Sequence, residues 1–172
     1  MRASFLAFAV LLVLSSEGLP NDKPLANVWI FTAIDCPIAN GYSPELNRIR
    51  KEFSSKAIDF TLVYPEPTLT VSQIEAHLSE YELSFDFHHD KNHERVAASG
   101  VTVTPEVAVF AETGQLVYRG RIDNRYSEYG DRKNTATETY LRDVLQKLLS
   151  GTEVEFSETE PIGCFIEALA TN

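Results

Sequence analysis

Cysteine is scarce in this 172-residue sequence, which contains only Cys36 and Cys164. Two cysteines are too few for a fold built on a framework of disulfides, so they indicate either one bridge or a redox pair. Cys36 also lacks a cysteine partner nearby, because Ala39 stands where a Cys-x-x-Cys motif would have its second cysteine. A resolving thiol for Cys36 within this chain would therefore have to be Cys164.

Positive charge is also limited, since 15 Lys and Arg residues face 25 Asp and Glu residues, for a net charge of −10. An acidic domain of this kind repels nucleic acid and anionic lipid surfaces. We therefore expect neither nucleic acid nor a membrane surface as a partner.

Long apolar runs are missing after the N-terminus. Residues 1–18 carry one positive charge, an apolar stretch from Ala3 to Leu14 and then small residues, a pattern typical of a secretory signal peptide. We expect a single domain over 19–151 and a C-terminal tail over 152–172 that carries Cys164. The protein should then be exported to a bacterial periplasm or the extracellular space, without stable membrane insertion after cleavage. An uncleaved anchor is the alternative.

The order of predicted elements indicates an α/β fold. Apolar β-prone runs alternate with segments of helical period, and this order favours a central mixed sheet with helices on both faces. Two capping boxes, at Thr70–Gln73 and Thr135–Glu138, predict helix starts, and Gly100 and Gly151 predict helix ends. The expected strands cover 27–34, 58–64, 84–88, 106–111 and 115–122, and the expected helices start at about Pro44, after Thr70, at His93 and after Thr135.

Cys36 follows the first predicted strand, where a helical pattern takes over. Unpaired N–H groups and the positive end of the helix dipole favour a thiolate at such a turn, and the thiolate is the reactive form. We therefore expect Cys36 to be an exposed, ionisable nucleophile at the carboxyl end of the sheet.

The strand–Cys36-Pro37–helix opening, together with Val101-Thr-Val-Thr-Pro105 ahead of a strand, resembles the thioredoxin superfamily. This resemblance implies a thioredoxin-like fold over about residues 26–150 and a cis-proline at Pro105 that faces the reactive cysteine. The backbone of Thr104 would then be free to pair with an extended substrate, as in β-augmentation. The alternative is that Thr104 and Pro105 merely start an edge strand.

More narrowly, the chain resembles exported peroxiredoxin-like (AhpC/TSA) redoxin-domain proteins. The resemblance implies a thiol-dependent oxidoreductase with an antioxidant role and no cofactor. Its substrate would be a protein disulfide or a peroxide, with an unknown electron donor. Cys36 would be catalytic, and Pro37, Thr104 and Pro105 would bind substrate. The motifs that carry the resemblance are Asp35-Cys-Pro-Ile-Ala-Asn40, Thr104-Pro-Glu106, Tyr118-Arg-Gly-Arg-Ile-Asp123 and Gly163-Cys-Phe-Ile166.

The sequence departs from this pattern at two positions. Ala33 stands where a peroxiredoxin has the threonine or serine that orients its peroxide, and Asn40 stands where copper-binding relatives have a second cysteine. Cys164 can supply the missing thiol if the tail folds back, and it would then act as a resolving thiol toward oxidised Cys36. A structural disulfide, or a Cys164 that is unpaired or bound to another chain, remains open.

Two further functions are compatible with the sequence. A copper-binding module would use Cys36, Cys164 and one or more of His88, His89 and His93, although a solvated histidine tract is the simpler interpretation. A non-catalytic interaction domain on the same scaffold is the other, since a fold does not prove an activity.

Several polar residues near these motifs have an ordinary structural interpretation. We expect Asp35 and Asn40 to cap the first helix, and we expect the arginines at 119, 121 and 125 to lie on the surface of a hairpin instead of orienting an anion.

Overall fold

The computed structural model describes residues 23–53, 57–128 and 131–169. The predicted signal peptide, residues 1–18, lies outside these ranges. Within them, no helix has both the length and the apolar character that a membrane crossing requires.

The described residues form four helices and ten strands, and the helices and the longer strands follow one another in the predicted order. The helices are α1 (Pro37–Phe53), α2 (Val71–Glu80), α3 (Glu94–Ser99) and α4 (Tyr140–Leu149). The longer strands are β1 (Ala26–Phe31), β2 (Ile58–Tyr64), β3 (Asp86–His89), β5 (Glu106–Ala111) and β6 (Leu116–Gly120). The shorter strands are β4 (Val103–Thr104), β7 (Tyr126–Glu128), β8 (Asp131–Arg132), β9 (Ser157–Glu158) and β10 (Cys164–Phe165).

The central sheet has the strand order β3-β2-β1-β5-β6-β9 and is mixed, as predicted. Strands β1, β2 and β3 run parallel, β5 runs antiparallel to both β1 and β6, and β9 is parallel to β6. In the middle of the sheet, Val28 pairs with Phe60 on one side and with Val109 on the other. Each of these strands has a run of consecutive buried residues, over 30–31 in β1, 62–64 in β2 and 106–109 in β5, because both faces of this sheet are covered.

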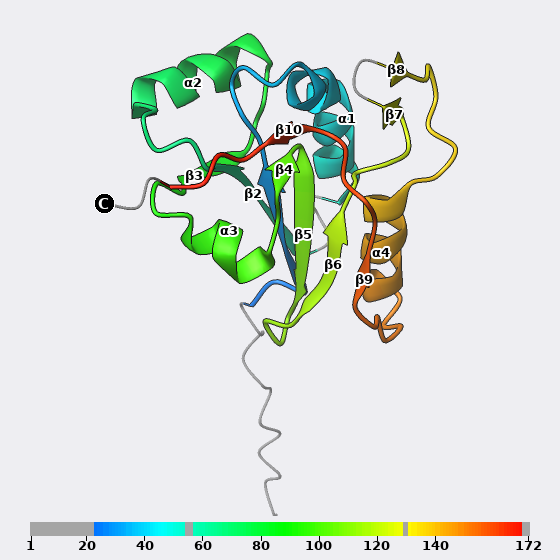
Figure 1. The fold of residues 1–172 in the computed structure, drawn as a ribbon. Coiled ribbons are helices and arrows are strands. Elements are labelled where there is room, and N and C mark those ends of the chain that lie inside the picture. The colour runs from blue at the N-terminus through cyan, green and yellow to red at the C-terminus, as the bar shows by residue number, and fades with distance from the viewer. Residues whose placement is uncertain (1–22, 54–56, 129–130, 170–172) are drawn as a thin grey trace, which may run out of the picture.

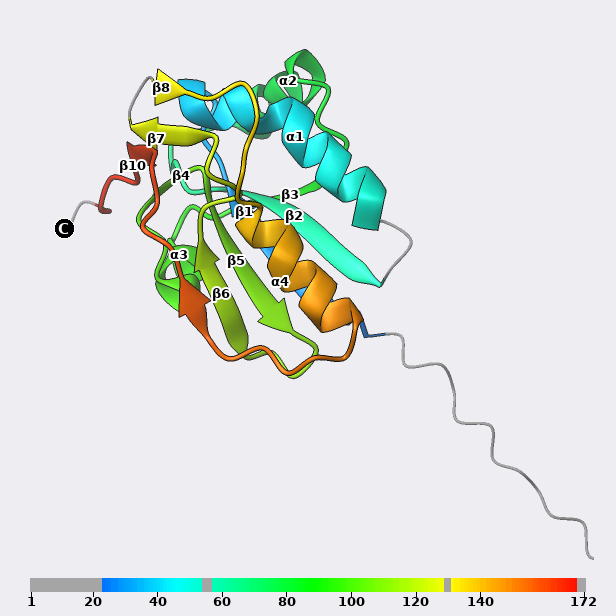
Figure 2. The same ribbon diagram turned by 90° about the vertical axis from the view of Figure 1, so that its right-hand side faces the viewer.

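Helices cover both faces of the sheet (Figures 1 and 2). The larger core cluster lies on the face covered by α1, α2 and α4, which contribute Leu46, Ile74 and Leu141. On the other face, Val96 of α3 and Ile166 of the tail pack against a smaller cluster of Phe31, Val63, Val101 and Ala108. The predicted α/β class, with helices on both faces of a mixed sheet, is therefore confirmed.

The first helix begins earlier than predicted, at Pro37 instead of about Pro44. Proline is favoured in the first turn of a helix because the N–H it lacks has no partner there. The helical spacing of apolar residues after Pro44 had suggested a later start, whereas Pro37 holds the first position and Pro44 lies inside the helix. The earlier start places Cys36 directly at the helix N-terminus.

One of the two predicted capping boxes is confirmed. The Thr70 side chain accepts a hydrogen bond from the Gln73 amide, and the Gln73 side chain accepts one from the Thr70 amide. The box predicted at Thr135–Glu138 is wrong, since α4 has Thr139 as its N-cap residue. Thr137 instead exchanges hydrogen bonds with the Asn124 side chain, which holds this segment against the β6–β7 connection.

The described part of the tail has no helix, as expected, but it is not a loose extension. Its first short strand, β9, extends the central sheet, and its second, β10, pairs antiparallel with β4. Figure 1 shows the tail passing along β6 and then crossing the end of the sheet near the start of α1.

Candidate functional site

Cys36 lies where the sequence predicted it, in the turn between β1 and α1. The amide of Asn40 donates to the carbonyl of Cys36 at 2.9 Å, which makes Cys36 the residue from which the helix starts. The amide of Thr32 donates to Val63 at 2.9 Å and fixes the chain as it leaves the sheet. The free N–H groups of the first helical turn therefore surround this position and favour negative charge there.

Pro105 faces this cysteine. The Thr104–Pro105 peptide bond is cis, as the resemblance implied, and the Cys36 thiol donates a hydrogen bond to the Thr104 carbonyl at 3.0 Å. Pro105 therefore lies in a turn next to the sulfur and does not simply begin an edge strand.

The expectation that Cys36 is exposed is wrong, because its exposed fraction is 0%. Cys36 belongs to the larger core cluster, and Ile162 and Cys164 of the tail pack against that cluster. The prediction failed because it treated the strand-to-helix turn alone, whereas the tail returns over that turn in the folded chain.

Cys164 lies next to Cys36, with which its side chain shares a hydrogen bond. In the β4–β10 pair Cys164 stands opposite Thr104, the residue that accepts the Cys36 hydrogen bond. Burial, hydrogen bonding to Cys36 and the negative charges of Cys36 and Asp35 raise the pKa of Cys164 to about 12. Both cysteines are free thiols in this structure. The two sulfurs thus lie side by side without a bond between them.

The backbone of Thr104 is not free, contrary to what the resemblance implied. Cys164 pairs with Thr104, Phe165 pairs with Val103, and the Ile166 amide donates to the Thr102 carbonyl at 3.0 Å. The position expected for an extended substrate is therefore filled by the tail of the same chain. Pro37, the remaining predicted substrate contact, is exposed at the first position of α1.

Glu106 supports the cis-proline turn, a role that sequence reasoning did not assign to it. Its carboxylate accepts the amides of Thr102 at 2.8 Å and Val103 at 3.3 Å, although only 2% of the residue is exposed. Burial raises the pKa of Glu106, while the two amide hydrogen bonds oppose that shift. The signal in the sequence was an acidic residue directly after Pro105 in an otherwise apolar strand.

A buried polar chain fixes the other side of the Cys36 turn. The Asn40 amide group donates to the Ile34 carbonyl at 2.9 Å, and its oxygen accepts from His77 Nε2 at 2.8 Å. The Tyr64 hydroxyl then donates to His77 Nδ1 at 2.9 Å. Burial lowers the pKa of His77, which suits the neutral tautomer that these bonds require. Asn40 is thus a link between helix and turn, not the cap that we expected.

The histidine tract serves the neighbouring loop. His89 donates to the Glu66 carbonyl and His93 to the Pro65 carbonyl, each at 2.8 Å. His88 lies 3.8 Å from the Asp90 carboxylate. Among the described residues, no group of three or more His, Cys, Asp or Glu side chains is arranged to hold a metal ion. The copper alternative therefore gains no support from the geometry.

The three hairpin arginines have structural partners. Arg119 pairs with Glu158 of β9 and Arg121 donates to the Glu160 carbonyl, so both hold the tail. Arg125 was expected on the surface but is buried, where it contacts Glu45 at 3.0 Å and Asp123 at 3.5 Å. It is buried because α1 packs over the β6–β7 connection and brings Glu45 to it.

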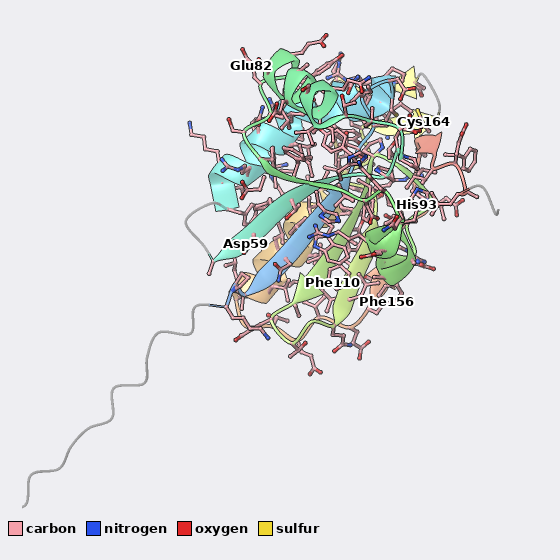
Figure 3. The ribbon with its side chains drawn as sticks, turned by 90° about the vertical axis from the view of Figure 1, so that its left-hand side faces the viewer. Asp59, Glu82, His93, Phe110, Phe156 and Cys164 are labelled. Carbon is pink, nitrogen blue, oxygen red and sulfur yellow. The ribbon has the colours of Figure 1, made fainter. Side chains whose placement is uncertain are left out.

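A hollow of about 150 Å³ opens beside Cys164. Its lining includes Ala33, Thr104 and Cys164, together with three acidic residues, Asp35, Glu66 and Glu167. Asp35 is exposed at its edge. Figure 3 shows Cys164 at the end of the sheet opposite Asp59, which is near the start of β2. The site thus lies at the carboxyl end of the parallel strands, as predicted.

Comparison with solved structures identifies similar folds. A hypothetical protein of Sinorhizobium meliloti is 21% identical, with a TM-score of 0.75 over 87% of this chain and 83% of that one. A thiol-disulfide oxidoreductase of Bacteroides fragilis is 18% identical, with a TM-score of 0.54 over 74% and 82% of the two chains. A secreted Mycobacterium tuberculosis disulfide oxidoreductase homologous to E. coli DsbE is also 18% identical, with a TM-score of 0.50 over 76% and 82%.

No curated protein matches the sequence. The redoxin family does match, over residues 13–138, which is most of the chain. That range contains Cys36 and the cis-proline turn, whereas Cys164 lies beyond it. With the α/β architecture, the turn that carries Cys36 and the cis Pro105 facing it, the match leads to one conclusion: the chain belongs to the redoxin family and has a thioredoxin-like fold.

Proposed function

We propose that this protein is an exported thiol-disulfide oxidoreductase, with Cys36 as its nucleophile and Cys164 as its resolving thiol. The observation that carries the proposal is the proximity of the two cysteine side chains, which share a hydrogen bond beside Thr104. Cys36 donates to the Thr104 carbonyl, and Cys164 lies opposite Thr104 in the β4–β10 pair. A resolving thiol must reach the first sulfur without a large rearrangement, and this arrangement supplies one.

The reaction needs two exchanges. The Cys36 thiolate attacks one sulfur of a substrate disulfide, which forms a mixed disulfide and releases the other substrate sulfur as a thiolate. The Cys164 thiolate then attacks Cys36, which releases the second substrate sulfur and leaves a Cys36–Cys164 disulfide. The substrate gains two electrons and the protein loses them, and an external thiol reductant returns the protein to its dithiol form.

The pKa of Cys164 fits this order of events. In the free dithiol form, burial and the neighbouring Cys36 hold the pKa of Cys164 at about 12, so Cys164 stays protonated at neutral pH. Once Cys36 is bonded to a substrate sulfur, it can no longer raise the pKa of Cys164 through a thiol hydrogen bond or a like charge. Cys164 therefore becomes easier to ionise at the step in which it attacks.

Peroxide reduction and copper binding are less well supported. The position of the expected peroxide-orienting hydroxyl is Ala33, and the arginines that would bind an anion are engaged with Glu45, Glu158 and Glu160. Export rests on the N-terminal sequence pattern and on the secreted disulfide oxidoreductase among the similar structures.

The test is turnover of a disulfide-linked fluorescent peptide with dithiothreitol as the reductant. We expect Cys36→Ser to lose activity by at least about 100-fold, because the attacking thiolate is the only reactive form. Cys164→Ser is the matched variant: mixed with the peptide in the absence of dithiothreitol, it should still carry out the first exchange and accumulate a mixed disulfide at Cys36, visible by mass spectrometry. Turnover that survives in a folded Cys36→Ser protein would refute the proposal.

A further inference from the structure

The tail segment over residues 163–166 lies on the same backbone edge that a protein substrate would need. It forms a short antiparallel pair with β4 and continues with the Ile166 amide bonded to the Thr102 carbonyl at 3.0 Å. Main-chain pairing of this kind is how an extended peptide adds to a sheet edge. The tail therefore fills the edge as a bound strand would, and it places a cysteine next to Cys36.

This segment also closes access to Cys36. The sulfur of Cys36 has no exposed surface, and Ile162 and Cys164 pack against the cluster that contains it. In thiol–disulfide exchange the Cys36 sulfur must approach one substrate sulfur in line with the substrate S–S bond that breaks. Exchange with a partner therefore requires that the tail atoms covering Cys36 move away. Figure 1 shows β10 crossing the end of the sheet above β4, between the start of α1 and β3.

The tail is attached more firmly before this segment than within it. Thr159 bonds the Arg119 carbonyl at 3.1 Å, the Arg121 amide at 2.9 Å and the Tyr118 hydroxyl at 2.8 Å. After Glu160, the ladder with β4 contains only two residue pairs, and one of its residues, Phe165, is 85% exposed. Short segments with few buried contacts open at low free-energy cost, so residues 161–169 can leave while β9 stays in the sheet.

Gly163 sets the fit of this segment to the edge. A Cβ atom at position 163 would overlap the Thr104 carbonyl oxygen and lie 2.6 Å from the Thr104 carbonyl carbon. These are backbone atoms of the cis-proline turn, which cannot move aside as a flexible side chain would. A strand that places its cysteine opposite Thr104 therefore needs glycine immediately before that cysteine.

We propose that residues 163–166 are an internal occupant of a strand-docking site on β4, and that Cys36 becomes accessible only when they leave. The partner that competes with them is an extended protein segment with glycine directly before its cysteine. This proposal rests on the proposed function for its biological meaning, but its test measures access to Cys36 and peptide docking, not turnover.

The experiment compares full-length, reduced wild type with Gly163→Val, and locates iodoacetamide labelling at Cys36 by mass mapping. The valine side chain should expel the segment from β4 and speed labelling of Cys36 by at least about tenfold. The reagent then reaches Cys36 without waiting for the tail segment to open. Phe165→Val is the matched control: it introduces the same residue into the same segment at a position that is 85% exposed, and it should label within about twofold of wild type.

A peptide added in trans then tests docking. The hexapeptide Pro-Ile-Gly-Ser-Phe-Ile has serine in place of cysteine and cannot form a disulfide, so any effect reports strand pairing alone. It should slow Cys36 labelling in Gly163→Val, whereas the same peptide with valine in place of glycine should not.

If Gly163→Val does not fold, Ile166→Ser replaces it, since Ile166 contributes the apolar contact of the segment to the second core cluster. Equal labelling of Cys36 in the folded variant and wild type, or the same rate with and without the glycine peptide, overturns the proposal.

Discussion

At the scale of single residues, the behaviour of Cys164 depends on a neighbour that is far away in the sequence. Burial is the largest cause of its raised pKa, and Cys36 adds a hydrogen bond and a like charge. Asp35 contributes a further negative charge from the exposed edge of the turn. The two cysteines therefore do not act as equivalent thiols, although each is a lone cysteine in the sequence.

This dependence predicts how Cys164 reacts when Cys36 is changed. In Cys36→Ser the like charge of Cys36 is lost, so the pKa of Cys164 should fall from about 12 toward its ordinary value. The alkylation rate of Cys164 at pH 9 should then rise by about tenfold or more, because only the thiolate reacts. The measurement is the iodoacetamide rate at Cys164 from pH 7 to pH 10, followed by mass mapping.

Ser79→Ala, on the exposed side of α2, is the control and should leave the Cys164 rate unchanged. An unchanged rate in Cys36→Ser as well would show that burial alone, and not the neighbouring sulfur, determines the pKa of Cys164.

At the scale of elements, α2 holds the back of the site. His77 on this helix links Tyr64 at the end of β2 to Asn40 on α1, and Asn40 holds the Ile34 carbonyl in the Cys36 turn. The position of His77 depends on where α2 starts, and the Thr70–Gln73 capping box determines that start. A local signal in the sequence thus positions a residue that supports the Cys36 turn.

Removal of this cap should lower the free energy of unfolding by a measurable amount. Thr70→Ala loses the side-chain acceptor for the Gln73 amide, and loss of such a cap costs about 1 kcal/mol in the free energy of unfolding. Urea denaturation followed by circular dichroism measures the change. Ser72→Ala is the control, at an exposed position in the first turn of α2. It should change the free energy of unfolding by less than about 0.5 kcal/mol. Equal effects of the two substitutions would argue against the cap.

At the scale of the whole molecule, a cluster of charges ties α1 to α4 and to the β6–β7 connection. Glu45 of α1 is 4% exposed and contacts Arg48, Arg125 and Arg142. Asp123 accepts the Tyr42 hydroxyl at 2.7 Å and lies 3.5 Å from Arg125. Burial opposes ionisation of Glu45, but hydrogen bonds from the three arginines outweigh it and lower its pKa to about 2. The negative charge of the Glu45 carboxylate thus compensates the positive charges of the surrounding arginines.

This cluster predicts a pH dependence of stability. The pKa of Glu45 is lower in the folded chain than the ordinary value of 4.5, so its contribution is present above pH 4.5 and is lost as the pH falls toward 2. Glu45→Gln should lower the free energy of unfolding at pH 7 by on the order of 2 kcal/mol, and the difference from wild type should shrink between pH 4.5 and pH 2.

Urea denaturation at several pH values between 2 and 7 measures this difference. Glu75→Gln, an exposed position on α2, is the control and should show little change at any pH. A gap between Glu45→Gln and wild type that stays constant down to pH 2 would count against a depressed pKa at Glu45.

The sequence by itself determined the local features of this protein. Strand β2, the α2 cap, the end of α3 at Gly100 and the cysteine between the first strand and helix follow from patterns of neighbouring residues. The cis Pro105 followed from a resemblance carried by a short motif. Each of these depends on interactions within a few residues, which a sequence displays directly.

Only the tertiary structure decided what surrounds the sulfur of Cys36. The pairing of Cys164 with Thr104, the burial of Cys36, the close approach of Gly163 and the buried position of Arg125 all arise between segments far apart in the chain. The tail pairs with a strand edge that the packed sheet leaves open. A pattern of neighbouring residues does not show which edge that is. The sequence therefore identified the two sulfurs, and the folded chain brought them together and covered one of them.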